Sequence, residues 1–222
     1  MMAKDLSKMP LPKLDDLFTT EEERTNANLE KVVDIKISDI DDFPDHPFKV
    51  IDDDKMEKMK NSIIDNKVII PALVRPKPNG RYEMISGHRR NKASELLELN
   101  TIPCIVRDLT DDEATIIMVD SNLQREKILP NEKAFAYKMK MEALGHQGKQ
   151  TSRPVVDKLK TADEIGKEKG DSGRQVQRYI CLTKLIPKLL EMVDIEQIAF
   201  RPAVELSFLT GKLMGKSIML EL

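Results

Sequence analysis

Cysteine is scarce in this chain of 222 residues, which contains only Cys104 and Cys181. The two thiols lie far apart, and neither belongs to a zinc-binding spacing or to a disulfide framework. Also missing is any run of about 18 apolar residues, the length that a membrane-spanning helix requires. The N-terminus lacks the apolar core of a signal peptide. We therefore expect a protein of the reducing cytoplasm with no membrane partner.

Charged residues, by contrast, are abundant. They make up 33% of the sequence, beside 40% hydrophobic residues, a composition typical of a soluble, helix-leaning protein. The formal net charge of −2 hides a gradient, because residues 1–60 carry 10 Lys or Arg against 16 Asp or Glu, whereas residues 133–192 carry 13 against 7. The basic segment has the charge expected of a nucleic-acid-binding surface, although a charged run is more often only a solvated face.

The hydrophobic pattern divides the chain into four parts. Residues 1–30 mix proline with polar and charged residues, and we expect a disordered tail there. Residues 31–110 alternate short strand patterns with two helices, which predicts an α+β domain with a small mixed sheet. Residues 111–192 have helical patterns, and residues 193–222 form a C-terminal helical segment. The expected strands are 33–37, 72–75, 82–85 and 102–107, and the expected helices are 55–66, 89–99, 111–123 and 130–144.

A glycine between a predicted strand and a predicted helix is the most informative feature. Residues 82–85 have the pattern of a strand, and the helix begins just after Gly87. Such a turn leaves free N–H groups at a helix N-terminus, where the helix dipole favours negative charge. Arg89 and Arg90 then offer forked donors that suit phosphate oxygens. We predict a polyphosphate site; the alternative is that both arginines lie on the surface of an amphipathic helix.

A second polar cluster follows at the end of a later predicted helix. It consists of Asn122, Gln124 and Arg125, and we expect it to contribute to the same site. Alternatively, Gln124 and Arg125 only terminate the helix, because a cation near a helix C-terminus is favourable.

Residues 162–182 have the spacing of a DNA-binding helix-turn-helix. Ile165 supplies the apolar contact, Gly166 permits close approach of two helices and Gly170 permits the turn, although Lys169 stands where an apolar residue is more usual. Val176 and Tyr179 should face inward, and Ser172 with Gln175 predicts a capping box.

The second helix of this element carries residue types suited to DNA contact. Arg and Gln side chains pair with base edges, and lysines neutralise phosphates. The predicted DNA-binding residues are Lys167, Ser172, Gly173, Arg174, Gln175, Gln177, Arg178 and Lys184. The alternative is an ordinary helical hairpin with a solvated basic side.

Three further motifs precede this element in a fixed order: Ser86-Gly87-His88-Arg89-Arg90-Asn91-Lys92-Ala93, Thr101-Ile102-Pro103-Cys104-Ile105-Val106-Arg107-Asp108 and Asn122-Leu123-Gln124-Arg125-Glu126. Over roughly residues 32–206, the chain resembles the ParB family of chromosome and plasmid partition proteins. The resemblance implies a sulfiredoxin/ParB-like α+β domain followed by an all-α helix-turn-helix domain.

The same resemblance implies a function. ParB proteins bind a palindromic centromere-like site on double-stranded DNA, and CTP with Mg²⁺ closes the homodimer into a clamp that slow hydrolysis reopens. A ParA-type ATPase moves the complex. The nucleotide-binding residues that the resemblance implies are Arg75, Ser86, Gly87, His88, Arg89, Arg90, Asn122, Gln124 and Arg125.

Two positions depart from the family pattern. The family usually has glutamate where this chain has His88, and glutamate directly before the asparagine, where this chain has Ser121. Mg²⁺ prefers carboxylate and water oxygens, so the second replacement counts against metal binding and CTP hydrolysis more than against nucleotide binding. Asn122 is the remaining predicted metal ligand, with Asp120 as a substitute if the helix presents it. His88 has the simpler interpretation of a polar helix cap.

Two other classes of function compete with the partition protein. An enzyme on the same fold, such as a kinase or nuclease, would need positioned carboxylates, and sulfiredoxin chemistry would need a cysteine beside Gly87. A transcriptional regulator would bind DNA through the helix-turn-helix and use the N-terminal domain only for dimer contacts. The family's usual C-terminal dimerisation domain has no counterpart before Leu222, so we expect either that the polypeptide is truncated or that its dimer depends on the N-terminal and helical regions.

Overall fold

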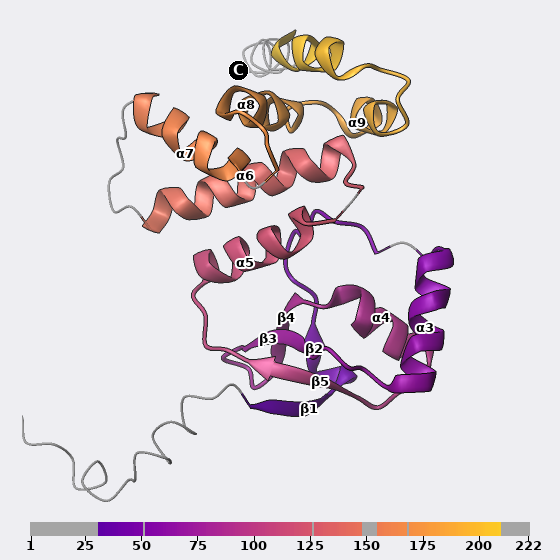
Figure 1. Cartoon of the computed structure of the whole chain (residues 1–222). Coiled ribbons are helices and arrows are strands. Elements are labelled where there is room, and N and C mark those ends of the chain that lie inside the picture. The colour runs from indigo at the N-terminus through magenta and orange to yellow at the C-terminus, as the bar shows by residue number, and fades with distance from the viewer. Residues whose placement is uncertain (1–30, 51, 126, 148–154, 168, 210–222) are drawn as a thin grey trace, which may run out of the picture. The chain divides into compact units, whose positions relative to one another are not determined.

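Five short strands form one mixed sheet in the computed structural model, which describes residues 31–50, 52–125, 127–147, 155–167 and 169–209 (Figure 1). The strand order is β1-β5-β3-β4-β2. Strands β1 and β5 pair antiparallel, as do β3 and β4, whereas β3–β5 and β2–β4 are parallel pairs. The predicted mixed sheet is therefore confirmed. The strands are β1 (Val32–Lys36), β2 (Ile40–Asp41), β3 (Ala72–Pro76), β4 (Tyr82–Ser86) and β5 (Thr101–Val106).

The hairpin between β3 and β4 forms where the sequence predicts it. The Lys77 N–H donates to the Arg81 carbonyl at 2.8 Å, and Gly80 turns the chain with a φ of +78°. The first strand begins and ends one residue earlier than expected, because Ile37 starts the 3-10 turn η2 (Ile37–Asp39).

Two helices accompany the sheet (Figure 1). They are α3 (Asp54–Asn66) and α4 (His88–Leu96). Met56, Ile63 and Ala93 form a small core between them. Ile64, next to the buried Ile63, has a side chain that is 64% exposed. Helix α4 ends before the expected residue 99 because Glu98 adopts a φ of +54°, which a helix does not accommodate.

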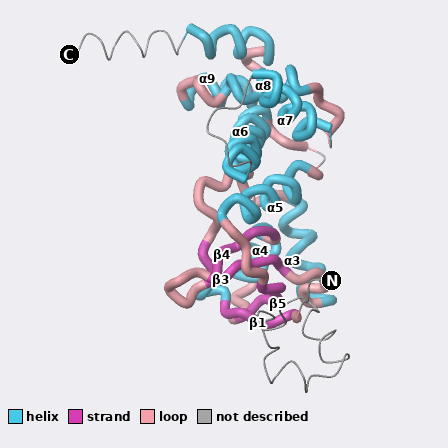
Figure 2. Tube along the Cα trace, turned by 90° about the vertical axis from the view of Figure 1, so that its left-hand side faces the viewer, coloured by secondary structure: helices cyan, strands magenta, loops and turns pink. Residues whose placement is uncertain are grey.

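The rest of the described chain is helical (Figure 2). Helix α5 begins with a complete capping box between Thr110 and Glu113, which stabilises its first turn. Helix α6 continues three residues past the expected end at Leu144. Residues 200–209 are also helical, whereas the predictions for residues 1–30 and 210–222 fall outside the described residues. The named helices are α5 (Asp111–Leu123), α6 (Pro130–Gln147), α7 (Val155–Lys167), α8 (Gly173–Leu182) and α9 (Pro187–Asp194).

The largest hydrophobic core crosses the boundary expected near residue 110. It joins Phe48 and Ile85 of the sheet region to α5 through Met118 and to the later helices through Ile165 and Val176. Each of these five side chains is at most 2% exposed. The sheet end that carries Ile85 therefore packs in the same core as α7 and α8.

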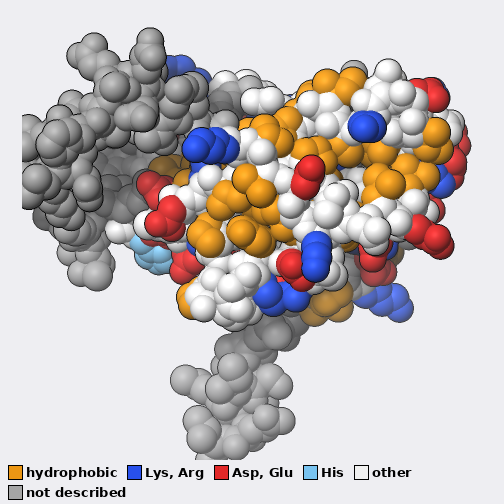
Figure 3. Space-filling model, turned by 90° about the horizontal axis from the view of Figure 1, so that it is seen from below, with side chains coloured by type: hydrophobic (Ala, Val, Ile, Leu, Met, Phe, Trp, Pro, Cys, Tyr) orange, Lys and Arg blue, Asp and Glu red, His pale blue; other side chains and the backbone are white. Residues whose placement is uncertain are grey.

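Apolar side chains are also exposed on the sheet side of the molecule. Val32 and Val33 of the edge strand β1 are 56% and 47% exposed, and Ile69 is 75% exposed. Figure 3, which views the molecule from below, shows hydrophobic side chains gathered on this face. No helix in the described part of the chain is long and apolar enough to span a membrane.

Candidate functional site

The turn at Gly87 joins β4 to α4 in a conformation that suits glycine. Its φ is +112°, and a Cβ atom there would lie 2.9 Å from the Cβ of Ala72. Because Gly87 occupies the N-cap position, α4 starts without a side-chain cap. Helices α3, α5 and α8, by contrast, are capped by Asp53, Thr110 and Ser172. The N-terminal donors of α4 therefore have no competing side-chain acceptor at the cap.

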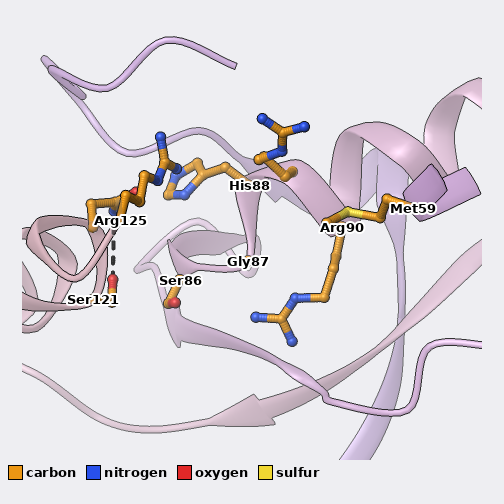
Figure 4. A pocket seen from close by; sticks show the side chains of 9 residues that line it. Met59, Ser86, Gly87, His88, Arg90, Ser121 and Arg125 are labelled. Carbon is orange, nitrogen blue, oxygen red and sulfur yellow. Dashed lines mark hydrogen bonds between the residues drawn. The ribbon is translucent and has the colours of Figure 1, made fainter. Parts of the chain in front are cut away.

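A pocket opens at this turn (Figure 4). Its volume is about 150 Å³, below the roughly 300–1,000 Å³ of pockets that enclose whole ligands. It can therefore hold a few charged groups rather than a complete nucleotide. The lining residues are Met59, Ser86, Gly87, His88, Arg89, Arg90, Ser121, Asn122 and Arg125.

The two arginines of α4 have different partners. Arg89 donates to the carboxylate of Asp53 at 2.7 Å. Arg90 donates to the Pro71 carbonyl at 2.9 Å and also to that of Ile70. In Figure 4 the Arg90 side chain runs down from α4, and its guanidinium lies below Gly87, apart from the Arg125 side chain. Arg89 is thus held by a carboxylate that an anion can replace, whereas Arg90 ties the turn to the segment before β3.

Arg125 follows the end of α5 and reaches the pocket from the side opposite Arg90 (Figure 4). Its guanidinium carbon lies 5.4 Å from the centre of the Phe48 ring, in cation–π contact. Burial lowers the pKa of Arg125, but an arginine stays charged at neutral pH. A half-buried cation with an apolar platform is well placed to attract an anion.

His88 lies beside Arg125 at the first position of α4 (Figure 4). Its side chain is 7% exposed, and its ring centroid lies 4.0 Å from that of His46. Burial, with His46 and Arg125 nearby, lowers the pKa of His88 to about 3, so the ring is neutral at pH 7. Within the described residues, its buried Nε2 has no hydrogen-bond partner. A buried nitrogen without a partner is unusual, and here it borders a pocket.

Three predicted site residues do not line the pocket. Arg75 of β3 pairs instead with the buried Glu83 at 2.5 Å and with Asp111 at 2.7 Å. Gln124 is exposed as the C-cap of α5. Asp120 forms an ion pair with Lys140 of α6. The structure therefore brings together seven of the nine predicted nucleotide-binding residues and leaves out Arg75 and Gln124.

The pocket offers few side chains suitable as ligands for the predicted Mg²⁺ ion. The lining of the pocket includes Ser121 and Asn122 but no carboxylate, and the Asn122 amide donates to the Met118 carbonyl at 2.9 Å. Among the described residues, no group of three or more His, Cys, Asp or Glu side chains could hold a metal ion. The residues present do not fit a protein-held Mg²⁺ ion, which prefers carboxylate oxygens.

Residues that the sequence analysis did not assign to the site also take part. Asp53 holds Arg89, His46 stacks on His88, and Met59 lines the pocket while packing beside Met56. The only local signal was the position of Asp53 directly before a helix, which is typical of an N-cap.

A second candidate surface is formed by α7 and α8. Gly166 permits their close approach, since a Cβ there would lie 2.9 Å from the Val176 side chain, and Gly170 makes the turn with a φ of +70°. Ile165 and Val176 are buried as predicted. Ser172 caps α8 by accepting the Gln175 N–H at 3.3 Å. The two helices therefore have the close approach, the turn and the Ser172 half of the capping box that the pattern predicts.

The outward side of α8 is basic. Arg174 and Arg178 are exposed, as are Ser172, Lys167 and Lys184, while Gln175 and Gln177 are half-buried. The expectation that Gly173 is exposed is wrong: it is buried, its N–H donates to Asp163 at 2.6 Å, and a Cβ there would lie 2.5 Å from that carboxylate. Gly173 therefore supports the start of α8.

Comparison with known proteins now identifies the family. The ParB N-terminal domain model matches residues 21–123. Residues 21–123 belong to the ParB N-terminal domain family. The chain is 31% identical over 163 residues to the chromosome-partitioning protein Spo0J of Thermus thermophilus, covering 73% of this chain and 55% of the relative. It is 35% identical over 132 residues to the nucleoid occlusion protein of Lysinibacillus sphaericus, covering 59% and 44%.

The chain thus spans about half the length of the curated relatives it matches. A solved structure with a similar fold is the C-terminally truncated chromosome-partitioning protein ParB from Caulobacter crescentus complexed to the centromeric parS site. The TM-score is 0.51 at 23% identity, over 83% of this chain and 92% of that chain. This likeness supports the mixed α+β fold.

Proposed function

We propose that this chain is a site-specific DNA-binding protein of chromosome or plasmid partition, whose binding to DNA depends on CTP. The observation that carries the proposal is the uncapped start of α4 at Gly87, which borders a pocket with Arg89, His88 and Arg125. Family membership supports the same assignment. The expected cytoplasmic location agrees with action on DNA and stays a prediction.

The pocket suits the phosphates of a nucleotide. The N–H groups at the start of α4 and the helix dipole favour an anion, and Arg125 and Arg89 supply two cations beside them. The unpartnered Nε2 of His88 can serve as a further hydrogen-bonding atom for a phosphate group. CTP is the nucleotide that the family resemblance implies, with Ser86, Gly87 and Asn122 as the other contacts. Arg75 and Arg90 have structural partners, and Gln124 is exposed outside the pocket, so their contact with nucleotide rests on the family resemblance alone.

Nucleotide binding should not require magnesium. The pocket lining has no carboxylate among the described residues, and Asp120 pairs with Lys140. We expect the affinity for radiolabelled CTP to change less than about twofold when EDTA replaces Mg²⁺. The Ser121→Glu variant should gain a clear dependence on Mg²⁺, because it restores a carboxylate oxygen. A strict requirement for Mg²⁺ in the unmodified chain would contradict this prediction.

DNA binding is assigned to the helix-turn-helix of α7 and α8. Arg174 and Arg178 are exposed on α8, and Lys167 and Lys184 are exposed nearby. Arginine reads guanine edges in the major groove, and lysines neutralise phosphates. A palindromic site would need two recognition helices, so we propose a homodimer. Contact with a ParA-type ATPase is a further proposal that rests on the family resemblance.

The direct test combines two measurements on one preparation. Footprinting on genomic DNA fragments should reveal a protected site, and labelled CTP should bind saturably in competition with CTP but not with ATP. Arg89→Ala should weaken CTP binding while the initial footprint remains. Lys92→Ala is a matched control, because Lys92 is an exposed cation of the same helix and pairs with Glu95. Absence of saturable CTP binding with or without DNA would reject the CTP-responsive function.

Two other outcomes would point elsewhere. Rapid phosphate transfer or DNA cleavage would favour an enzyme, although the pocket lining lacks the carboxylates that such enzymes position. A footprint whose extent and affinity are the same with and without CTP would favour a plain transcriptional regulator.

A further inference from the structure

Lys169 occupies a position where the helix-turn-helix pattern favours an apolar residue. In the structure its ammonium donates to the backbone carbonyl of Arg125 at 3.1 Å. Lys169 belongs to the turn that precedes α8, whereas the Arg125 side chain lines the pocket. One hydrogen bond thus joins residues 44 positions apart and connects the two candidate sites.

The turn that carries Lys169 is hydrogen-bonded to the end of α7, and α7 packs closely against α8 at Gly166. The Lys169 N–H donates to the Gly166 carbonyl at 3.0 Å, and the Asp171 N–H donates to the same carbonyl at 3.0 Å. Gly166 cannot be replaced without a clash with Val176 of α8. A displacement of α8 therefore moves Lys169 with it.

The same turn is also anchored to α6. The Asp171 carboxylate accepts from the Tyr137 hydroxyl at 2.6 Å and pairs with Lys133 at 2.5 Å. Lys133 in turn lies over the Tyr179 ring of α8, 4.6 Å from its centre. With α6 as one support and the Arg125 carbonyl as the other, the turn has contacts on two sides. Such a contiguous set of hydrogen bonds and packed side chains can carry energetic coupling.

We propose that Lys169 is a positioning residue that couples the DNA-reading helix α8 to the anion pocket through the Arg125 carbonyl. When DNA moves or rigidifies α8, Lys169 shifts or fixes the peptide that follows α5, and the Arg125 guanidinium changes its position in the pocket. Because coupling between binding sites is reciprocal, an anion on Arg125 alters the DNA affinity by the same factor. This inference rests on the proposed function for the identity of the two ligands.

The test measures a coupling factor, the ratio of the CTP dissociation constants without and with the duplex found by footprinting. Lys169→Met keeps an aliphatic side chain but removes the ammonium, and we expect the factor to fall at least fivefold toward 1. Lys169→Arg keeps a donor and should retain most of the coupling. Lys167→Met is the matched control: it removes a nearby exposed cation and should weaken DNA binding while leaving the factor within about twofold.

Two results would overturn the proposal. One is an unchanged coupling factor in a folded Lys169→Met protein. The other is a loss of DNA affinity like that of Lys167→Met with the factor intact, which would make Lys169 a simple phosphate contact. Thermal melting checks the folding of each variant, and Lys169→Arg keeps the test valid if the methionine variant does not fold.

A second readout separates this proposal from the identity of the nucleotide. Hydrogen exchange of the peptide containing residues 122–125 should slow on DNA addition in the unmodified chain but not in Lys169→Met. If CTP does not bind at all, the proposed function fails, while this exchange measurement still decides the role of Lys169. Equal protection in both proteins would reject the coupling.

Discussion

At position 87, both the backbone conformation and the available space require glycine. The φ of +112° disfavours any side chain, and the neighbouring Ala72 leaves no room for a Cβ atom. Gly80 has a φ of +78° but open space around it. Gly87 is therefore required both by its backbone conformation and by the lack of space for a Cβ atom, whereas Gly80 is favoured by its backbone conformation alone.

Gly87→Ala should lower the free energy of unfolding by about 1–3 kcal/mol, the range for strained backbone positions, and also weaken anion binding. Gly80→Ala should lower the free energy of unfolding by less, because a Cβ atom at Gly80 would meet no neighbouring atom. Urea denaturation of both variants provides the comparison. Equal losses would show that the space beside Ala72 is not limiting.

The ion pair between Asp53 and Arg89 competes with any anion for the same guanidinium. The Arg89 guanidinium is also the main cause that lowers the pKa of Asp53, so the carboxylate stays charged. Asp53 caps α3 as well, by accepting the Met56 N–H at 3.0 Å. Asparagine caps helices as effectively as aspartate, which allows the two roles to be separated.

Asp53→Asn should therefore tighten CTP binding by about two- to fivefold, the scale of a partly exposed ion pair, without unfolding α3. Titration with labelled CTP measures the change. Asp54→Asn, in the same helical turn and exposed, should have no effect. Weaker binding in Asp53→Asn would instead mean that Asp53 holds Arg89 in its binding position.

Among the elements, α8 combines a buried side with a basic exposed side. Val176 and Leu182 are fully buried, whereas Arg174 and Arg178 are exposed. The helix is therefore held firmly while its arginines remain available. We expect the exposed arginines to provide sequence discrimination and Lys184 to contribute charge alone.

Arg174→Ala should weaken binding to the footprinted site by about 1–3 kcal/mol, as for the loss of a base contact, with little change on unrelated DNA. Lys184→Ala should weaken binding to both and reduce the salt slope by about one. Fluorescence anisotropy at several salt concentrations measures both effects. Lys58→Ala, an exposed cation of α3, serves as the control. Equal losses of Arg174→Ala on both duplexes would make Arg174 a phosphate contact.

Local elements were largely predictable, because their signals lie within a few residues. The strand–glycine–helix pattern at Gly87 and the cap at Ser172 both depend on neighbouring positions, and both occur as expected. The stacking of His46 on His88 and the bond from Lys169 to Arg125 were not predictable, since they join residues 42 and 44 positions apart. The pairing of Arg75 with Glu83 was not predictable either, because Glu83 is on the adjacent strand and the register of the two strands decides the pairing.

For the whole molecule, the buried histidine links stability to pH. His88 has a pKa of about 3 in the folded chain against 6.5 for an ordinary histidine. Below about pH 6.5 the unfolded chain takes up a proton that the folded chain does not bind until about pH 3. The free energy of unfolding therefore falls as the pH falls through this window.

His88→Gln should remove this dependence. Between pH 7.5 and 5.5, the unmodified chain should lose about 1 kcal/mol more stability than the variant. Urea denaturation at the two pH values provides the measurement. The reverse order, with the variant more sensitive to acid, would show that His88 is protonated in the folded chain.

The order of strands in the sheet also governs when the protein can fold during its synthesis. Lys36 of β1 pairs with Thr101 of β5, so the first strand waits for a partner that is translated about 65 residues later. At the usual rate of roughly 5–20 residues per second, the delay is roughly 3–13 s. Throughout that interval Val32 and Val33 have no neighbouring strand, and the nascent chain depends on the ribosome or on chaperones to keep this edge from associating with other chains.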